Sequence, residues 1–200
     1  LYVGPLVLEK KASDDRQSIE SLAKAIRHKG DRKIIVCALS SLAAVDAEFI
    51  GLLISSISER EDWMALIGLG HQSQYRITQE LPSNVHVYPW LPVTFALAHA
   101  DCAVITAGYN TINECIYYGV PMLAFSLNTT DQNGCIARIV DHNLGLKATF
   151  DSCNKKSLQQ DIAQLLEDAE IKSALLQMQS HARSYHEHHI IEKVVRKYLA

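Results

Sequence analysis

The sequence has almost no net charge and few of the residues that keep chains unfolded. Its 19 Lys and Arg residues nearly balance 22 Asp and Glu residues, so a surface for nucleic acid or an anionic membrane is not expected. Only 9 Gly and 5 Pro residues occur, whereas 48% of the chain is hydrophobic, and this composition excludes wholesale disorder. The length of 200 residues fits a single packed domain that spans residues 1–200.

The sequence also lacks paired cysteines and long apolar runs. Its five cysteines are scattered and never spaced as Cys-x-x-Cys, which argues against zinc or a disulfide framework and favours a reducing compartment. No run approaches the roughly 20 apolar residues of a transmembrane helix, and no signal segment opens the chain. We therefore expect a soluble, cytoplasmic protein without a transmembrane segment or a bound metal.

Apolar runs alternate with helical patterns along the chain. Runs typical of buried strands cover residues 34–39, 63–69, 85–88, 102–106, 122–125 and 146–149. Helical patterns begin after residue 13, cover 94–99, 110–118 and 131–142, and continue from 156 to the end. Because parallel strands need crossover connections, this alternation predicts an α/β fold: a Rossmann-like open parallel sheet with helices on both faces. Such sheets bind ligands at the carboxyl ends of their strands.

The segment 104–114 reads as a buried strand, a turn of small residues and the start of a helix. Free N–H groups at a helix start bind phosphate, Gly108 allows close approach, and Thr106, Asn110 and Thr111 offer polar groups to phosphate oxygens. Glu114, about one turn later, could accept hydrogen bonds from a ribose diol. The alternative is purely structural: Gly108 permits a turn and Asn110 caps a helix.

Two flanking features extend this pattern. Trp90 follows a predicted strand, where an indole can stack on a base while the main chain of Leu91 meets the polar edge of the base. Asp131 and Gln132 follow another strand and place an acceptor beside an amide, which suits hydroxyl-rich ligands. Each has a structural alternative, since Trp90 could be a core residue and Asp131 a helix cap. Taken together, the order of base, phosphate, ribose and polyol groups indicates a nucleotide-sugar.

Five short motifs follow one another along the chain. They are Trp90-Leu91-Pro92, Ala98-His99-Ala100-Asp101, Gly108-Tyr109-Asn110-Thr111 with Glu114, Gly119-Val120-Pro121 and Asp131-Gln132. In this order and spacing, they resemble the donor-binding signature of the UDP-glycosyltransferase superfamily. The resemblance covers nearly the whole chain and implies the C-terminal half of a GT-B fold, which consists of two Rossmann-like domains. It further implies an inverting hexosyltransferase that needs neither a metal nor a cofactor.

The resemblance also implies a role for each matching residue. Trp90 stacks on uracil, the main chain of Leu91 pairs with it, and Glu114 holds the ribose. Asp131 and Gln132 bind the sugar hydroxyls. The diphosphate is bound by Ser41, Thr106, Gly108, Tyr109, Asn110 and Thr111. No catalytic residue is expected in this chain, because the family's general base lies in the N-terminal domain that binds the acceptor.

The ends of the chain fit the same interpretation. The chain starts without Met, and residues 1–12 resemble the connection from the preceding domain. We expect residues 185–200 to form a C-terminal helix that packs on that missing domain, and the chain alone to be inactive. His186 and His189 fall three residues apart on this helix, which would allow a metal, but a solvated helix end is the better interpretation.

Several residues depart from the family pattern. Thr106 stands in place of a histidine that faces the diphosphate, and Val93 in place of a glutamine. The other departures are Ser40 for glycine, Ser126 for proline and Cys135 for asparagine. The loss of the histidine alone removes a charge-assisted contact worth about 1.5 to 3 kcal/mol. Two alternatives therefore remain: a non-catalytic nucleotide-sugar-binding module or subunit of a split enzyme, and a UDP-sugar epimerase, which fits the motifs less well.

Overall fold

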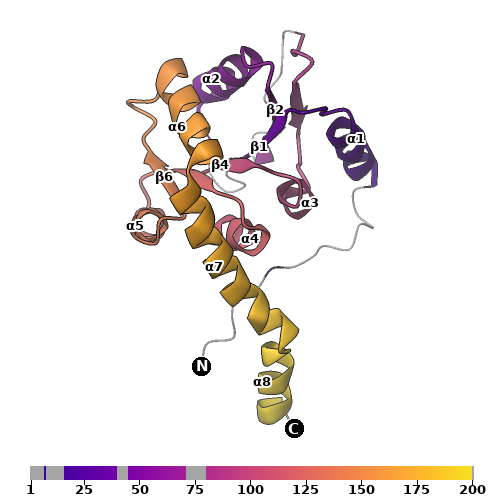
Figure 1. The fold of residues 1–200 in the computed structure, drawn as a ribbon, viewed down its shortest axis with the longest axis vertical. Helices are drawn as coiled ribbons and strands as arrows, with labels where there is room; N and C mark the ends of the chain where they lie inside the picture. Colours follow the sequence, from indigo (N-terminus) through magenta and orange to yellow (C-terminus); the bar gives the residue numbers. More distant parts are fainter. Residues whose placement is uncertain (1–6, 8–15, 40–44, 71–79, 200) are drawn as a thin grey trace.

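The computed structural model describes residues 7, 16–39, 45–70 and 80–199, which form an α/β fold around one parallel sheet (Figure 1). The sheet has six strands in the order β3-β2-β1-β4-β5-β6, and every pairing is parallel. This architecture confirms the predicted Rossmann-like sheet. The strands are β1 (Lys33–Ala38), β2 (Trp63–Gly68), β3 (Val85–Tyr88), β4 (Cys102–Ile105), β5 (Met122–Phe125) and β6 (Gly145–Ala148).

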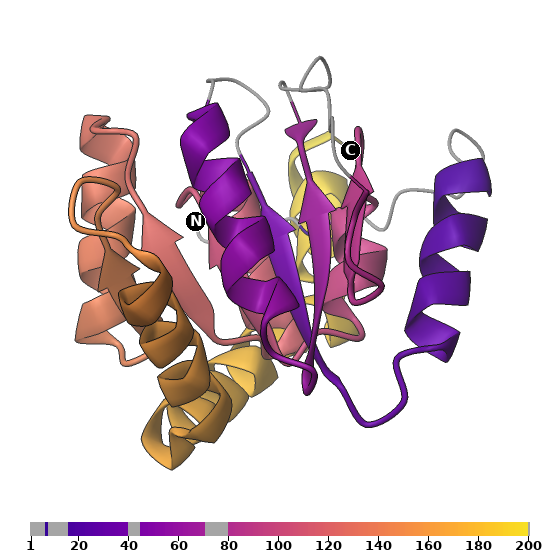
Figure 2. The same cartoon turned by 90° about the horizontal axis from the view of Figure 1, so that it is seen from above.

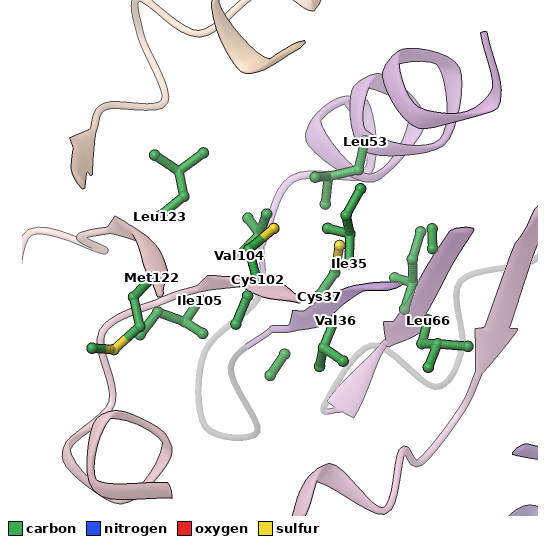
Figure 3. Close-up of a cluster of buried hydrophobic side chains, with 14 of the residues drawn as sticks. Ile35, Val36, Cys37, Leu53, Leu66, Cys102, Val104, Ile105, Met122 and Leu123 are labelled. Carbon is green, nitrogen blue, oxygen red and sulfur yellow. The ribbon is translucent and has the colours of Figure 1, made fainter. Parts of the chain in front are cut away.

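The central strands are apolar along their whole length because both of their faces are covered. All residues of β2, β4 and β5 are buried, as is β1 after Lys33. Ile35 pairs with Cys102, and alternate residues of β1 point to opposite faces. Figure 3 shows Ile35 directed toward Leu53 of a covering helix, with Val36 on the other side of the sheet. Continuous apolar runs of this kind are typical of a buried parallel sheet.

Helices lie on both faces of the sheet (Figure 2). α2 and α6 pack against each other over one face, while α3 contacts both α4 and β1 on the other, and α1 lies beside the β3 edge. In Figure 1, α7 runs diagonally across the molecule and α8 extends from it at the end opposite to α2. The helices are α1 (Arg16–Arg27), α2 (Ala47–Ser58), α3 (Val93–Leu97), α4 (Tyr109–Tyr118), α5 (Thr130–Asp141), α6 (Lys155–Glu167), α7 (Ala169–Glu187) and α8 (Ile190–Leu199).

The C-terminal region is helical, as the sequence pattern predicts. It consists of three helices: α7 continues to Glu187 and α8 begins at Ile190, so the last helix starts later than the expected residue 185. His189 lies between them with a φ of 50°, a left-handed conformation that interrupts helical hydrogen bonding. His186 belongs to α7 and His189 lies beyond the end of that helix, so the two histidines are not three residues apart on one helix. Of residues 1–12, the expected interdomain connection, only Val7 lies within the described residues.

Asn84, just before β3, forms hydrogen bonds with the end of α2, the following turn and the start of β2. Its buried side-chain NH2 group donates to the carbonyl oxygens of Ile57, Arg60 and Trp63 at 3.2, 3.1 and 3.1 Å. These three carbonyls lie at the end of α2, in the following turn and at the start of β2. One amide group therefore joins a helix end, the turn after it and a strand start, and adds to the backbone hydrogen bonds that the Ile57 and Arg60 oxygens already accept from Arg60 and Trp63.

The C-terminal end of α4 is held by α7. The side chains of Gln179 and Arg183 both donate to the carbonyl oxygen of Tyr117, at 3.1 and 3.0 Å. A cation at a helix C-terminus also interacts favourably with the helix dipole. Gly119, in the left-handed conformation with a φ of 71°, ends α4 and allows the chain to turn directly into β5. Helix α4 is thus anchored at one end by α7.

All five cysteines are free thiols. Burial raises the pKa of Cys37 to about 12, and it also raises the pKa of Cys102 and of Cys115 far above the usual range, so all three thiols are neutral at physiological pH. Across the described parts of the chain, no helix is long and apolar enough to cross a membrane.

Candidate functional site

The strand order reverses direction between β1 and β4, which lie side by side at the centre of the sheet. In open parallel sheets of this type, ligands bind in the crevice outside the carboxyl ends of the strands at such a reversal. The loops that follow β3, β4 and β5 reach this edge and carry most of the predicted binding residues. Ser40 and Ser41 follow β1 in the sequence and lie outside the described residues.

The turn after β4 opens into the N-terminus of α4. Gly108 is the N-cap residue and has no side chain to cap the helix, and the first turn carries no acidic residue. Tyr109 is 64% exposed, and Gly108 and Asn110 are also exposed. The first N–H groups of α4 therefore point toward solvent at the carboxyl edge, where an anion can reach them. The alternative that Asn110 caps this helix is wrong, since Asn110 is already its second residue.

The backbone conformation of this turn differs from the sequence-based expectation. Gly108 has a φ of −68°, which any residue adopts, while buried Ala107 takes the left-handed conformation with a φ of 49°. A Cβ atom on Gly108 would meet no atom within 4 Å, so the turn itself does not require glycine there. The absence of a side chain instead leaves open space at the helix start. Sequence reasoning missed Ala107, because alanine carries no signal for a positive φ.

Thr106 and Glu114 lie on either side of the start of α4. Thr106 is buried at the end of β4, so most of its side chain is enclosed by the fold. Glu114 is half-buried in the second turn of α4. The structure thus places Glu114, Asn110 and Thr111 on the same helix, with Thr111 also half-buried.

The loop after β3 exposes Trp90 and buries Leu91. Trp90 is 50% exposed, whereas Trp63 in β2 is 1% exposed, so the core tryptophan is Trp63 and the core alternative for Trp90 is wrong. Leu91 packs against Gly68 at the end of β2, where a Cβ atom would lie 2.7 Å from the Leu91 Cβ. This contact folds the loop back toward the centre of the sheet. Sequence reasoning missed Gly68, although a glycine inside a predicted strand indicates a close backbone approach.

The loop between β5 and α5 is built from side-chain hydrogen bonds. The Leu127 N–H donates to Oε1 of half-buried Gln132 at 2.7 Å, and the Asn128 N–H donates to Oγ of Ser126 at 3.0 Å. Asn128 takes the left-handed conformation, with a φ of 61°. The N-cap residue of α5 is Thr129, so the alternative that Asp131 caps this helix is wrong.

Asp131 is fully exposed in the first turn of α5. A hydrogen bond from the Thr129 side chain lowers the pKa of the Asp131 carboxyl group, which is therefore ionised at neutral pH. A carboxylate at a helix N-terminus accepts hydrogen bonds and interacts favourably with the helix dipole. Asp131 thus presents an anionic acceptor at the sheet edge.

The described residues of the site lie along the edge in a defined order. The N-termini of α4 and α5 follow adjacent strands, since Ile105 pairs with Ala124. Leu91 rests on the end of β2, which is separated from β4 only by β1, so roughly 10 Å of sheet edge separates it from the α4 turn. The arrangement suits an extended ligand that lies across the strands rather than a compact one.

Two surface hollows lie away from this reversal point. One, of about 210 Å³, is lined by Lys147, Cys153 and Asp161 beyond the edge strand β6, and the other, of about 260 Å³, lies between α1 and His86 of β3. Neither contains a predicted site residue. Within the described ranges, no group of three or more His, Cys, Asp or Glu side chains is placed to hold a metal ion.

Comparison with known proteins identifies relatives that match most of the chain. It is 26% identical to UDP-glucuronosyltransferase 3A2 of Mus musculus over 88% of its length, and 24% identical to the uncharacterized UDP-glucosyltransferase YdhE of Bacillus subtilis over 83%. The chain spans 33% and 40% of these proteins. Among solved structures, the glycotransferase of kitacinnamycin matches with a TM-score of 0.73 at 22% identity, over 78% of this chain and 40% of that one.

A second solved structure, the calicheamicin glycosyltransferase CalG4, matches with a TM-score of 0.71 at 18% identity, over 84% of this chain and 44% of that one. At such low identities, these two structures support the fold alone. The family model described as UDP-glucoronosyl and UDP-glucosyl transferase matches residues 20–188. Because this match covers most of the sequence, the chain belongs to the UDP-glycosyltransferase family.

Proposed function

We propose that this chain is the donor-binding part of a glycosyltransferase and that it holds a UDP-sugar or another nucleoside-diphosphate sugar. The observation that carries the proposal is the exposed N-terminus of α4, with Gly108 as its N-cap residue, at the carboxyl edge of the sheet. Such a helix start binds a diphosphate through backbone N–H groups and needs no lysine. Membership in a family of UDP-sugar transferases supplies the class of ligand.

The donor lies across the strands in this proposal. Exposed Trp90 stacks on the base and the main chain of Leu91 meets its polar edge, while Glu114 accepts hydrogen bonds from the ribose. Asp131 and Gln132 bind the sugar beyond the end of β5. The diphosphate occupies the turn formed by Gly108, Tyr109, Asn110 and Thr111, with Thr106 and Ser41 beside it.

Transfer requires groups outside this chain. We propose that a preceding acceptor-binding domain or chain supplies the general base, and that the hexose is transferred with inversion and without a metal. In this proposal, the N-terminus of α4 stabilises the negative charge that develops on the diphosphate as it leaves the sugar. The free cysteines favour a reducing compartment such as the cytoplasm.

Calorimetric titration of the 200-residue chain with UDP tests the binding proposal. We expect saturable heat below about 1 mM UDP, which corresponds to about 4 kcal/mol of binding free energy. Folded protein that gives no heat at millimolar UDP would contradict the proposal.

The ribose contact has its own test. Glu114→Ala weakens UDP by about 1 to 3 kcal/mol if the carboxylate holds the ribose. The same substitution should weaken the binding of 2′-deoxy-UDP much less than that of UDP, because 2′-deoxy-UDP already lacks one of the ribose hydroxyls that Glu114 would bind. Glu170→Ala, at an exposed acid in the first turn of α7, is the matched control and leaves both affinities unchanged.

Thr106 favours a second candidate function, nucleotide-sugar binding without transfer. Its side chain is buried and uncharged, so it adds no cation to the diphosphate site. To distinguish the candidates, the chain is joined to its upstream sequence and assayed for release of UDP from UDP-glucose. Turnover supports the transferase, whereas UDP binding without turnover supports the binding module.

A further inference from the structure

The hollow between α1 and the edge strand β3 brings together nitrogen groups from both elements. Lys24 and His28 lie one turn apart on α1, and His86 lies in β3. Ser21 and Ala25 complete the lining, and no carboxylate belongs to the part of it that the structure describes. Figure 2 shows α1, in indigo, beside this edge of the sheet. An ammonium group and two imidazole rings therefore meet in one place, away from the start of α4.

His86 has ring nitrogens that the fold itself does not use. The residue is half-buried and forms no hydrogen bond with any described residue. Every fully buried side-chain nitrogen or oxygen atom of the described residues does have a partner, so the ring nitrogens of His86 face accessible space. Burial, together with the nearby Arg32 guanidinium, lowers the pKa of His86. The ring is therefore neutral at pH 7 and offers one N–H donor and one acceptor nitrogen.

His28 and Lys24 each have a polar group available on the same side. Nδ1 of His28 lies 2.7 Å from the carbonyl oxygen of Lys24. Because a carbonyl oxygen only accepts, Nδ1 carries the proton in this bond, and Nε2 is left for another partner. The Lys24 side chain is exposed and forms no ion pair with a described carboxylate, although Glu20 lies one turn earlier on α1. Its ammonium group is thus available to a ligand in the hollow.

The charges around the hollow favour an anion over a metal ion. Two imidazole rings suit a transition metal, but Lys24 in the lining and Arg32 close to His86 would both repel a cation. The Nε of Arg32 donates to the backbone carbonyl oxygen of Glu61 at 3.0 Å, and no described carboxylate pairs with this guanidinium. Nor does a third ligand-forming His, Cys, Asp or Glu of the described ranges join the two histidines.

We propose that the hollow between α1 and β3 is a second binding site of this chain, which takes the phosphate group of a small molecule or free phosphate. Lys24 and the His86 N–H donate to phosphate oxygens. Nε2 of His28 accepts from a phosphate hydroxyl, or donates when the ring takes up a proton. The volume of about 260 Å³ lies just below the roughly 300 to 1,000 Å³ of pockets for drug-sized ligands, so a whole nucleotide-sugar does not fit.

Titration of the 200-residue chain with inorganic phosphate tests this site, at an ionic strength held constant with chloride. We expect the imidazole NMR signals of His28 and His86 to shift together and to saturate below about 20 mM phosphate. Lys24→Gln should weaken this binding about fivefold or more, because it removes a charge-assisted hydrogen bond. Lys193→Gln, at an exposed lysine of α8, makes the same change in net charge and should stay within about twofold of the parent.

A second titration, with glycerol 3-phosphate, identifies the source of the phosphate group. Tighter binding than that of inorganic phosphate assigns the site to phosphate monoesters, whereas weaker binding assigns it to the free ion. The site does not depend on the proposed function, so a chain that fails to bind UDP leaves this inference standing.

Three results would overturn the proposal. The first is an unchanged His86 signal at about 20 mM phosphate, or a shift confined to the backbone amides of Gly108 and Thr111 at the start of α4. The second is equal phosphate affinity of Lys24→Gln and Lys193→Gln. The third is a shift of both imidazole signals with zinc chloride and not with phosphate, which would make the hollow a metal site. Because Lys24 is exposed, its variant should fold like the parent, and the melting temperature checks this.

Discussion

Gly68 and Leu91 approach each other so closely that no side chain fits between them. A Cβ atom on Gly68 would lie 2.7 Å from the Cβ of Leu91, well inside the roughly 3.5 to 4.0 Å at which carbon atoms attract. Gly68 ends β2, and Leu91 is buried beside exposed Trp90. Because Gly68 has no side chain, the loop that carries Leu91 and Trp90 can approach the centre of the sheet this closely.

Gly68→Ala should displace Leu91 and with it the Trp90 loop. We expect a loss of about 1 to 3 kcal/mol of unfolding free energy from overpacking, together with weaker UDP binding. Urea denaturation and calorimetry measure the two effects. Gly51→Ala is the control: a Cβ there, inside α2, meets nothing within 4 Å, so this variant should be more stable by up to about 1 kcal/mol. A Gly68→Ala chain as stable as the parent would refute the steric argument.

Trp90→Ala and Trp63→Ala should have opposite profiles. Trp90 is half-exposed, so its removal should cost about 1 to 3 kcal/mol in UDP binding and little in stability. Trp63 is buried, with the Arg60 guanidinium 4.1 Å from its ring centroid, and its removal should lower stability by about 3 to 5 kcal/mol. The melting temperature and the UDP affinity of each variant distinguish them. If Trp90→Ala binds UDP like the parent, the indole does not stack on the base.

Much of the sheet could be predicted because its strands are continuous apolar runs. The predicted limits of 85–88 and 122–125 match β3 and β5, and the other strands differ by a residue at one or both ends. The division of the C-terminal region was missed, because neither Gly nor Pro marks its breaks. Asp168 was the available signal, since its carboxylate accepts from the N–H groups of Glu170 and Ile171 at the start of α7.

The parts of the candidate site that lie within one continuous segment could be predicted from the sequence. The contacts between segments that are far apart in the sequence could not. The start of α4 follows from the strand, turn and helix pattern around Gly108. The Gly68 contact with Leu91 joins the end of one strand to the loop after another, and no local pattern encodes it. Within the loop after β5, the turn cluster that begins at Asn128 predicts a turn, but it does not predict that the Leu127 N–H donates to Gln132.

Asn84→Ala should destabilise the fold and leave the candidate site unchanged. Removal of the amide leaves the carbonyl oxygens of Ile57, Arg60 and Trp63 without this donor, at a cost of about 1 to 3 kcal/mol. Asn84→Asp should cost more, because a carboxylate would then face the same oxygens. Chemical denaturation measures both, with Asn133→Asp at an exposed position expected to stay within about 0.5 kcal/mol of the parent. Equal stability of Asn84→Asp and the parent would contradict the assigned bonds.

The buried thiols should make the protein sensitive to alkali. Burial raises the pKa of Cys37 from 9.0 to about 12, so above pH 9 the unfolded chain loses a proton that the folded chain keeps. The thiol's effect on stability is therefore constant below pH 9, and stability then falls by up to about 1.4 kcal/mol per pH unit as pH rises toward 12. Urea unfolding between pH 8 and 10.5 should show a smaller fall for Cys37→Ala. Parallel curves for variant and parent would disprove this role of Cys37.

The strand order also has a consequence for how the chain acquires its structure during synthesis. β1 lies at the centre of the sheet, and its second neighbour, β4, follows only after β2 and β3 have been made. Until Cys102 to Ile105 emerge, β1 carries an apolar edge with unpaired backbone groups, which favours aggregation. A chain cut between β3 and β4 would therefore leave an unpaired strand on either side of the cut, so the two halves of this sheet depend on each other for solubility as well as for the binding edge.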